Sequence, residues 1–206
     1  MKNFRAAAAG DFRRRCYNSL MARGAFILAG GRSRRMGADK ALLEYRGRPL
    51  AAWVAEQAAR AAGAAWLVGP AERYGHLGFP CLEERFPGCG PLSGIDAALR
   101  SGLAEWCLVL ACDMPGVESG PLGQLLDTAA ASGADAAVTV SPGGRPEPLC
   151  AVYHARLAPL ADRLLREGRL SVHELLASIR WVPFPAPGGR FAANINTPGE
   201  WAQWNR

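Results

Sequence analysis

Residues 25–40 read AFILAGGRSRRMGADK, an apolar run that passes directly into a segment rich in glycine and arginine. The apolar part predicts a buried strand, and the rest predicts the loop at its carboxyl end. Glycine lets the backbone approach a ligand closely, so that successive N–H groups can line a concave anion site. The glycines are Gly30, Gly31 and Gly37, and the cations beside them are Arg32, Arg34, Arg35 and Lys40. The chemistry of this segment therefore predicts a cradle for a triphosphate.

The spacing of this segment differs from two common phosphate-binding patterns. A Walker A loop requires lysine and a hydroxyl residue directly after its second glycine, whereas Gly37 is followed by Ala38, Asp39 and Lys40. The segment does not match G-x-G-x-x-G either. Lys40 still calls for a reason, because the chain has 22 arginines and only one other lysine, Lys2. We expect a specific role for Lys40; a connector with a solvated arginine cluster is the alternative.

Outward from this segment, short apolar runs alternate with stretches of helical composition. Further strands are expected at 65–68, 106–111, 136–140, 149–153 and 181–184, and helices at 49–62, 91–103, 121–131, 155–167, 171–178 and from 198. Strands that alternate with helices and are apolar throughout are typical of a mostly parallel sheet covered on both faces. The pattern predicts a single-domain α/β protein with a Rossmann-like three-layer fold.

Composition excludes two classes of partner. The chain has 206 residues, half of them apolar, and its longest candidate for a membrane span, residues 51–69, contains Glu56 and Arg60. Residues 1–23 hold six basic residues and one acidic residue, and therefore five of the six net positive charges. The remainder is nearly neutral, unlike a domain that binds nucleic acid through bulk charge. We expect neither a membrane nor a nucleic-acid partner.

The N-terminal region differs from the rest in composition. Residues 1–22 are rich in alanine and arginine and lack the apolar core of a secretory signal, whereas Met21 opens MARGAFILAGG, which is typical of a natural start. We expect residues 1–22 to be a flexible or mis-called extension, with a transit peptide as the alternative. Residues 23–206 are expected to form the folded domain.

The cysteines predict a reducing compartment. The chain has six cysteines, with no C-x-x-C pair and no cysteine and histidine cluster at zinc spacing. Cys107, Cys112 and Cys150 lie in or beside apolar runs, where cysteine behaves as a small hydrophobe. Buried, reduced thiols are typical of a cytoplasmic protein.

A second chemical element follows the strand expected at 106–111. Asp113 comes directly after this apolar run and is therefore expected at the carboxyl end of a buried strand. A carboxylate that faces a phosphate cradle suits Mg²⁺, which takes few protein ligands and bridges phosphate oxygens. Asp113 is thus the expected metal ligand; an aspartate that caps the following turn is the alternative.

Two further stretches are ordinary taken singly. Residues 88–94 (GCGPLSG) open a helix and offer free N–H groups to a ligand. Asn194 and Asn196 stand two positions apart, which puts both amides on one side of an extended segment. Each stretch alone is also compatible with a simple turn.

Five stretches together carry a specific resemblance. They are residues 28–43 (LAGGRSRRMGADKALL), 87–95 (PGCGPLSGI), 112–115 (CDMP), 145–153 (RPEPLCAVY) and 194–200 (NINTPGE). In this order they resemble the molybdenum cofactor guanylyltransferases, the MobA-like members of the nucleotidyltransferases. The resemblance covers nearly the whole chain after residue 24, and it implies a fold of the nucleotidyltransferase type.

The resemblance implies a reaction and a set of site residues. The reaction is Mg²⁺-dependent transfer of GMP from GTP to the phosphate of molybdenum-molybdopterin, with release of pyrophosphate. Molybdenum-insertion proteins and apo-molybdoenzymes are further candidate partners. The implied nucleotide-binding residues are Leu28, Ala29, Gly30, Gly31, Lys40, Glu84 and Asp113. The implied catalytic residues are Lys40, Asp113 and Arg35, the implied metal ligand is Asp113, and the pterin-binding residues are Asn194 and Asn196.

Two positions depart from the family pattern. Gly69 stands after the second strand, where some relatives have asparagine, so a side-chain contact to the nucleotide is lost or moved there. Glu84 stands where aspartate is usual and is one methylene longer.

Two other functions remain open at this stage. A related nucleotidyltransferase would use CTP, or would activate a sugar or alcohol phosphate; Gly30 and Gly31 favour GTP, because cytidylyl-transferring relatives usually have alanine at the first of these positions. A carrier of molybdopterin or nucleotide would need no metal carboxylate at the phosphates, so the combination of Arg35, Lys40 and Asp113 favours an enzyme.

Overall fold

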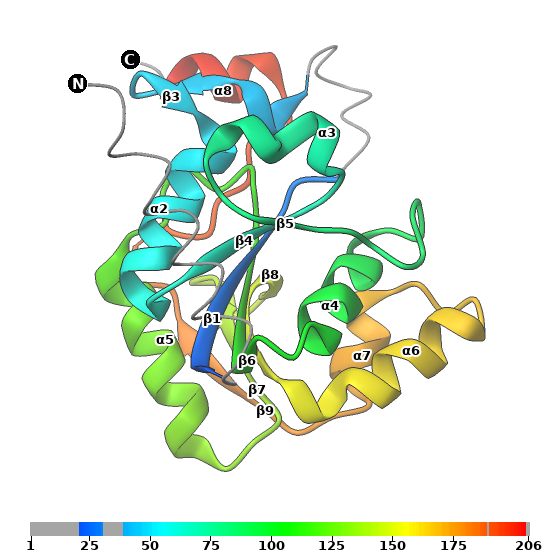
Figure 1. The fold of residues 1–206 in the computed structure, drawn as a ribbon. Helices are drawn as coiled ribbons and strands as arrows, with labels where there is room; N and C mark the ends of the chain where they lie inside the picture. Colours follow the sequence, from blue (N-terminus) through cyan, green and yellow to red (C-terminus); the bar gives the residue numbers. More distant parts are fainter. Residues whose placement is uncertain (1–20, 31–38, 189, 205–206) are drawn as a thin grey trace.

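The computed structural model describes residues 21–30, 39–188 and 190–204, and Figure 1 shows a central sheet with helices on both sides. The strands of the sheet are β1 (Met21–Leu28), β4 (Ala65–Val68), β5 (Cys81–Leu82), β6 (Ala104–Ala111), β7 (Ala136–Val140), β8 (Pro146–His154) and β9 (Trp181–Pro185). Their order is β5-β4-β1-β6-β8-β7-β9, and only β8 runs antiparallel to its neighbours. The predicted mostly parallel α/β fold is confirmed.

Helices cover both faces of the sheet. One face carries α2 (Leu50–Ala62) and α5 (Ser119–Ser132), and the other carries α4 (Pro91–Arg100), α6 (Ala158–Arg166) and α7 (Val172–Ala177) (Figure 1). Side chains alternate along the strands, so Ile27 and Leu108 join the core under α2 and α5, whereas Phe26 and Val109 join the core under α4 and α6. Both faces are therefore buried, as the uniformly apolar strands predicted.

The shorter elements escaped the sequence patterns. They are η1 (Lys40–Leu42), β2 (Glu44–Tyr45), β3 (Arg48–Pro49), α3 (Ala71–Tyr74), η2 (Gly75–Leu77) and the edge strand β5. The helix expected from residue 198 is present as α8 (Pro198–Trp204), and η3 (Ala155–Leu157) falls within the helix expected at 155–167. Elements of two to four residues are too short to display a periodicity. The helix expected at 155–167 is divided into η3 and α6, with Pro159 in the first turn of α6.

The first strand is longer than expected. Met21 donates its backbone N–H to the Leu103 carbonyl at 3.0 Å, and β1 is in register with β6 from Met21 onward. Met21 and Ala22 thus belong to the sheet, and residues 1–20 of the expected extension lie outside the described residues. No helix in the described ranges has the length and apolar character of a membrane span.

Candidate active site

The site lies where β1 and β6 end side by side. Leu28 is in register with Ala111, and the Cys112 N–H donates to the Leu28 carbonyl at 3.2 Å. In the sheet, β4 pairs with one edge of β1 and β6 with the other, so the chain reverses its direction of progress between them. The carboxyl ends of β1 and β6 therefore form a topological switch point, where open α/β sheets bind ligands. Gly30 and Asp113 therefore leave the sheet next to each other.

Three side chains distant in sequence meet at this edge. Lys40 Nζ lies 2.8 Å from Asp113 Oδ2 and donates to Asn196 Oδ1 at 3.0 Å. The side chains of Lys40 and Asp113 are 16% and 15% exposed, so water screens their charges only in part. Lys40 opens η1, and Asp39 caps this turn by accepting the Ala41 N–H. The structure thus brings together one predicted residue from each of three motifs.

The Asn196 segment is held from both sides. The Ile195 N–H donates to the Asp113 carbonyl at 3.0 Å, and the Ile195 side chain is fully buried. At the start of α8, Glu200 Oε2 accepts the N–H groups of Asn196 and Thr197, while Thr197 Oγ1 accepts the Glu200 N–H. This reciprocal capping box lowers the pKa of Glu200, chiefly through the bond from the Asn196 N–H. Glu200 was not among the predicted site residues, although T-x-x-E is a recognisable capping signal.

Glu84 lies at the other side of the β1 end. A Cβ built on Gly30 would be 3.7 Å from Glu84 Oε2, and one on Gly94 would be 3.3 Å from Glu84 Oε1. The Gly94 Cβ would also lie 2.7 Å from Leu28 Cδ2, so a larger residue at position 94 would displace the end of the Leu28 side chain. Three of the implied nucleotide-binding residues therefore lie together on this side of the site, namely Leu28, Gly30 and Glu84.

Burial raises the pKa of Glu84. A carboxyl whose pKa is higher in the folded than in the unfolded protein costs stability as the pH rises above its ordinary value, and costs none below it. We therefore expect Glu84→Gln to raise the melting temperature of the ligand-free protein at neutral pH and to leave it unchanged near about pH 4. Thermal denaturation across this pH range measures the difference.

The matched control is the exposed neighbour Glu83, whose replacement by glutamine should leave the pH dependence of the melting temperature unchanged. Equal destabilisation of the protein by Glu84→Gln at both pH values would contradict the prediction that the buried charge of Glu84 lowers stability at neutral pH. The same variant should bind nucleotide more weakly if Glu84 contacts it.

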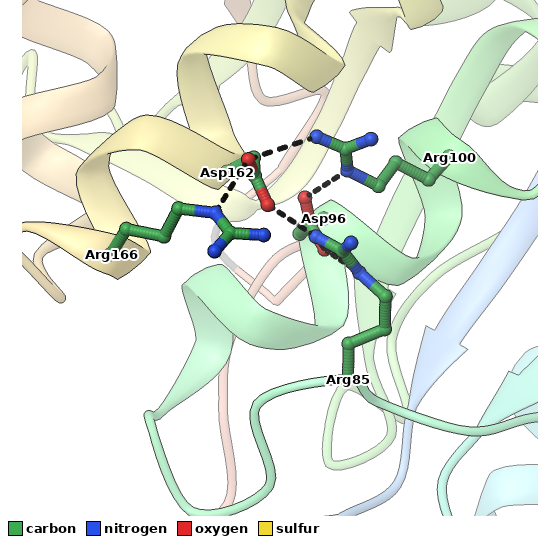
Figure 2. Close-up of polar contacts among 5 residues, drawn as sticks. All are labelled: Arg85, Asp96, Arg100, Asp162 and Arg166. Atoms are coloured by element: carbon green, nitrogen blue, oxygen red, sulfur yellow. Dashed lines mark hydrogen bonds and ion pairs between the residues drawn. The ribbon is translucent and has the colours of Figure 1, made fainter.

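An ionic network anchors the loop that carries Glu84 (Figure 2). The fully buried Asp96 on α4 accepts from Arg85 at 3.2 Å and from Arg100 at 3.0 Å. Asp162 on α6 pairs with Arg85, with Arg100 at 3.3 Å and with Arg166 at 3.0 Å. Hydrogen bonds from Arg166 and then Arg85 lower the pKa of Asp162. Arg85, the residue after Glu84, thus ties this loop to α4 and α6.

Replacing Asp96 with alanine should lower the free energy of unfolding by about 2 kcal/mol. The loss stays below that of breaking a fully buried pair, because the Arg85 and Arg100 side chains are 44% and 35% exposed and can turn to water. Urea denaturation measures it. Asp127→Ala is the control: this exposed partner of Arg23 should contribute less than about 1 kcal/mol. Equal losses in both variants would contradict the anchoring role of Asp96.

The donor chemistry of the site fits Mg²⁺. No group of three or more histidine, cysteine or acidic side chains with metal-binding geometry occurs in the described ranges. Mg²⁺ needs only one or two protein carboxylates when phosphates supply other oxygens. Asp113 is such a carboxylate, and the adjacent segment holds the buried Asn194 Oδ1, an amide oxygen with no hydrogen-bond partner among the described residues. Hard oxygen donors of this kind suit Mg²⁺ better than the soft metals that prefer thiolate ligands.

The remaining predicted residues divide into two groups. Leu28, Ala29, Gly30, Lys40, Glu84, Asp113, Asn194 and Asn196 are described, and all lie on β1, η1, the loop before α4 or the segments beside Asp113. Gly31 and Arg35 lie outside the described residues. The predicted burial of Cys107, Cys112 and Cys150 is confirmed, and none of the three forms a disulfide bond with another described residue. Burial raises the pKa of Cys107 to about 12.

Comparisons with known proteins bear on the same residues. The profile of a family described as "MobA-like NTP transferase domain" matches residues 25–180, a range that includes Lys40, Glu84 and Asp113. A protein of Opitutus terrae named "Probable molybdenum cofactor guanylyltransferase" is 36% identical over 184 residues, which cover 84% of this chain and 89% of that protein. The "Molybdenum cofactor guanylyltransferase" of Serratia proteamaculans is 31% identical over 186 residues, covering 87% of this chain and 92% of that one.

The fold is similar to that of a solved relative. The crystal structure of "Molybdopterin-guanine dinucleotide biosynthesis protein A" from Archaeoglobus fulgidus superimposes with a TM-score of 0.77 at 26% identity. The match covers 88% of this chain and 96% of that chain, so the similarity extends over the whole domain.

Proposed function

The chain belongs to the MobA-like NTP transferase family, as its motifs predicted, and we propose that it transfers GMP from GTP to the phosphate of molybdenum-molybdopterin. An oxygen of the acceptor phosphate forms a bond to the α-phosphorus, and the bond from that phosphorus to the departing pyrophosphate breaks. The observation that carries the proposal is the contact of Lys40 with Asp113 at the ends of β1 and β6. Guanylyltransferase names among similar proteins over most of the chain support it.

The residues near the reacting phosphates act by position and charge. An acceptor phosphate is already anionic, so the reaction needs no general base, in agreement with a site built from Lys40 and Asp113 without a histidine. Lys40 holds the phosphates of GTP and stabilises the negative charge that grows on them as pyrophosphate leaves. Arg35 is proposed to share this role.

The two substrates are assigned to two sides of the Lys40 and Asp113 pair. Nucleotide contacts are proposed for Leu28, Ala29, Gly30, Gly31 and Glu84. The pterin substrate is proposed to contact Asn194 and Asn196, on the segment bonded to the Asp113 backbone. Gly30 and Gly31 favour GTP, because glycine leaves more room for a purine than alanine.

Mg²⁺ is the proposed metal. Asp113 would hold it, and when bound it supplies positive charge to the phosphate oxygens. Molybdenum-insertion proteins and apo-molybdoenzymes are proposed as further partners, and the free buried thiols support a cytoplasmic location.

A product assay tests the proposal. Purified protein, Mg²⁺ and molybdenum-molybdopterin are incubated with GTP or CTP, and products are identified by mass spectrometry. We expect guanine dinucleotide with GTP alone. Cytosine product would overturn the base assignment while leaving the fold and metal carboxylate intact. Absence of product with both nucleotides would overturn the reaction.

Asn194→Ala should raise the KM for the pterin substrate about tenfold and leave the KM for GTP unchanged. Within the part of the chain that the structure describes, the buried Asn194 Oδ1 accepts no hydrogen bond, and satisfying such an atom recovers roughly 1–3 kcal/mol. Steady-state kinetics with each substrate varied in turn measures both constants. If the variant required a higher Mg²⁺ concentration and kept the pterin KM, this assignment would be contradicted, and Asn194 Oδ1 would instead be a metal ligand.

Asn196→Ala is the comparison variant and should behave differently. Both asparagines are predicted to contact the pterin, but Asn196 Oδ1 also accepts from Lys40 Nζ. Its loss should therefore raise the KM for GTP as well as for the pterin.

A further inference from the structure

Tyr74, the last residue of α3, reaches the edge of the active site from beneath it. Its side chain is 1% exposed, and its hydroxyl donates to the Ala29 carbonyl at 2.7 Å. The same hydroxyl lies 3.0 Å from Asp39 Oδ2. A phenol has one proton, which here is shared between two acceptors. Burial and the nearby Asp39 raise the pKa of Tyr74, so the hydroxyl stays protonated at neutral pH.

Asp39 is fully engaged in local contacts. Its Oδ2 also pairs with Arg73 Nε at 2.6 Å, and its Oδ1 accepts the Ala41 N–H at 3.1 Å. The side chain of Asp39 is 8% exposed. Because Asp39 precedes Lys40 and caps η1, these contacts determine the backbone from which the lysine side chain extends toward Asp113.

The same tyrosine accounts for Gly69. A Cβ at Gly69 would lie 2.9 Å from Tyr74 Cε2 and 3.0 Å from Tyr74 Cδ2, and the Gly69 φ of +154° disfavours other residues. The Tyr74 ring therefore occupies the space into which a side chain at position 69 would extend.

We propose that Tyr74 is a positioning residue, whose hydroxyl fixes Asp39 against the end of β1 and thereby sets the position of Lys40. The effect on catalysis rests on the proposed function of Lys40, whereas the effect on the η1 turn does not. Tyr74 itself is too deeply buried to touch the substrates. Its influence passes through one acceptor at the end of β1 and one at the start of η1.

The first test is equilibrium binding of GTP in the presence of Mg²⁺ by calorimetry. Tyr74→Phe keeps the ring against Gly69 and removes only the hydroxyl. We expect the dissociation constant of GTP to rise about tenfold, since misplacing a binding group by a small distance has a large effect. A loss of folded protein would lower the binding stoichiometry and leave this constant unchanged.

The matched control is Tyr153→Phe. Tyr153 is also buried, and its hydroxyl donates to one backbone carbonyl, that of Pro148, at 2.8 Å. It lies on β8, away from Lys40 and Asp39. This variant should lose similar stability and keep the GTP dissociation constant. Equal weakening in both variants would overturn the positioning role.

A double-mutant cycle tests whether Tyr74 acts through Asp39. Asp39→Asn retains the side-chain shape and a carbonyl acceptor. If the hydroxyl acts through Asp39, adding Tyr74→Phe to Asp39→Asn should weaken GTP binding by less than about twofold further. Fully additive effects would contradict the route through Asp39.

Hydrogen–deuterium exchange separates this proposal from the proposed reaction. In ligand-free protein, the Ala41 and Leu43 amides are bonded to Asp39 Oδ1 and the Lys40 carbonyl. Tyr74→Phe should speed exchange of a peptide containing both amides, and Tyr153→Phe should not. Faster exchange would support the role of Tyr74 even if the product assay failed. Unchanged exchange would overturn it even if the assay succeeded.

Discussion

Asp113→Asn should lower the turnover of guanine dinucleotide formation by about 10²-fold or more, the scale of removing one preorganised charge. Asparagine has nearly the same shape as aspartate and keeps an oxygen for the Lys40 ammonium at 2.8 Å. It lacks the negative charge that balances Lys40 and that is proposed to hold Mg²⁺. The loss should therefore come from charge alone, and turnover at saturating substrates measures it.

Asp135→Asn is the control for this variant. Like Asp113, Asp135 pairs with a basic side chain, here Arg156 at 2.9 Å. It precedes β7, however, at the opposite end of the sheet from the site. Its replacement should leave turnover within about twofold of the unmodified protein. Near-normal turnover in Asp113→Asn would remove Asp113 from the reaction centre.

Lys40→Met should also reduce turnover by about 10²-fold or more. Methionine retains an unbranched apolar side chain but removes the ammonium that contacts Asp113 and Asn196. Since the ammonium is proposed to stabilise the charge that grows as pyrophosphate leaves, both kcat and kcat/KM for GTP should fall. Melting temperatures check that the variant remains folded.

Lys40→Arg distinguishes charge from geometry. Arginine keeps the positive charge, but its planar guanidinium cannot occupy the position of a compact ammonium between Asp113 and Asn196. We expect turnover between those of Lys40→Met and the unmodified protein. Undiminished turnover in Lys40→Met would show that Lys40 serves only the structure of the site.

The local sequence predicted the strands and loops that carry the site residues, but it did not predict which strands are adjacent in the sheet. Gly30 and Asp113 each follow a continuous apolar run, so both were expected at the carboxyl ends of buried strands. That these two strands are adjacent is a property of the sheet order, in which β1 lies between β4 and β6. Nothing in either run specifies which strand becomes its neighbour.

Tyr74 shows why the roles of some residues could not be predicted from the sequence. It is 45 residues from Ala29 and 35 from Asp39, and α3 has only four residues. Asp96 and Asp162 are similar, because the two arginines that they share, Arg85 and Arg100, come from a loop and from α4 (Figure 2). Contacts of this kind follow from packing and leave no periodic signal in the chain.

The sequence by itself determined the α/β class, the family and the residue types of the site, because apolar strands, glycine-rich loops and charged residues at strand ends are local features. Only the tertiary structure decided that Lys40 meets both Asp113 and Asn196, and that Tyr74 fills the space beside Gly69. Those contacts depend on which strands pair and how closely helices pack on them, and such distances are set by the whole core rather than by any single segment.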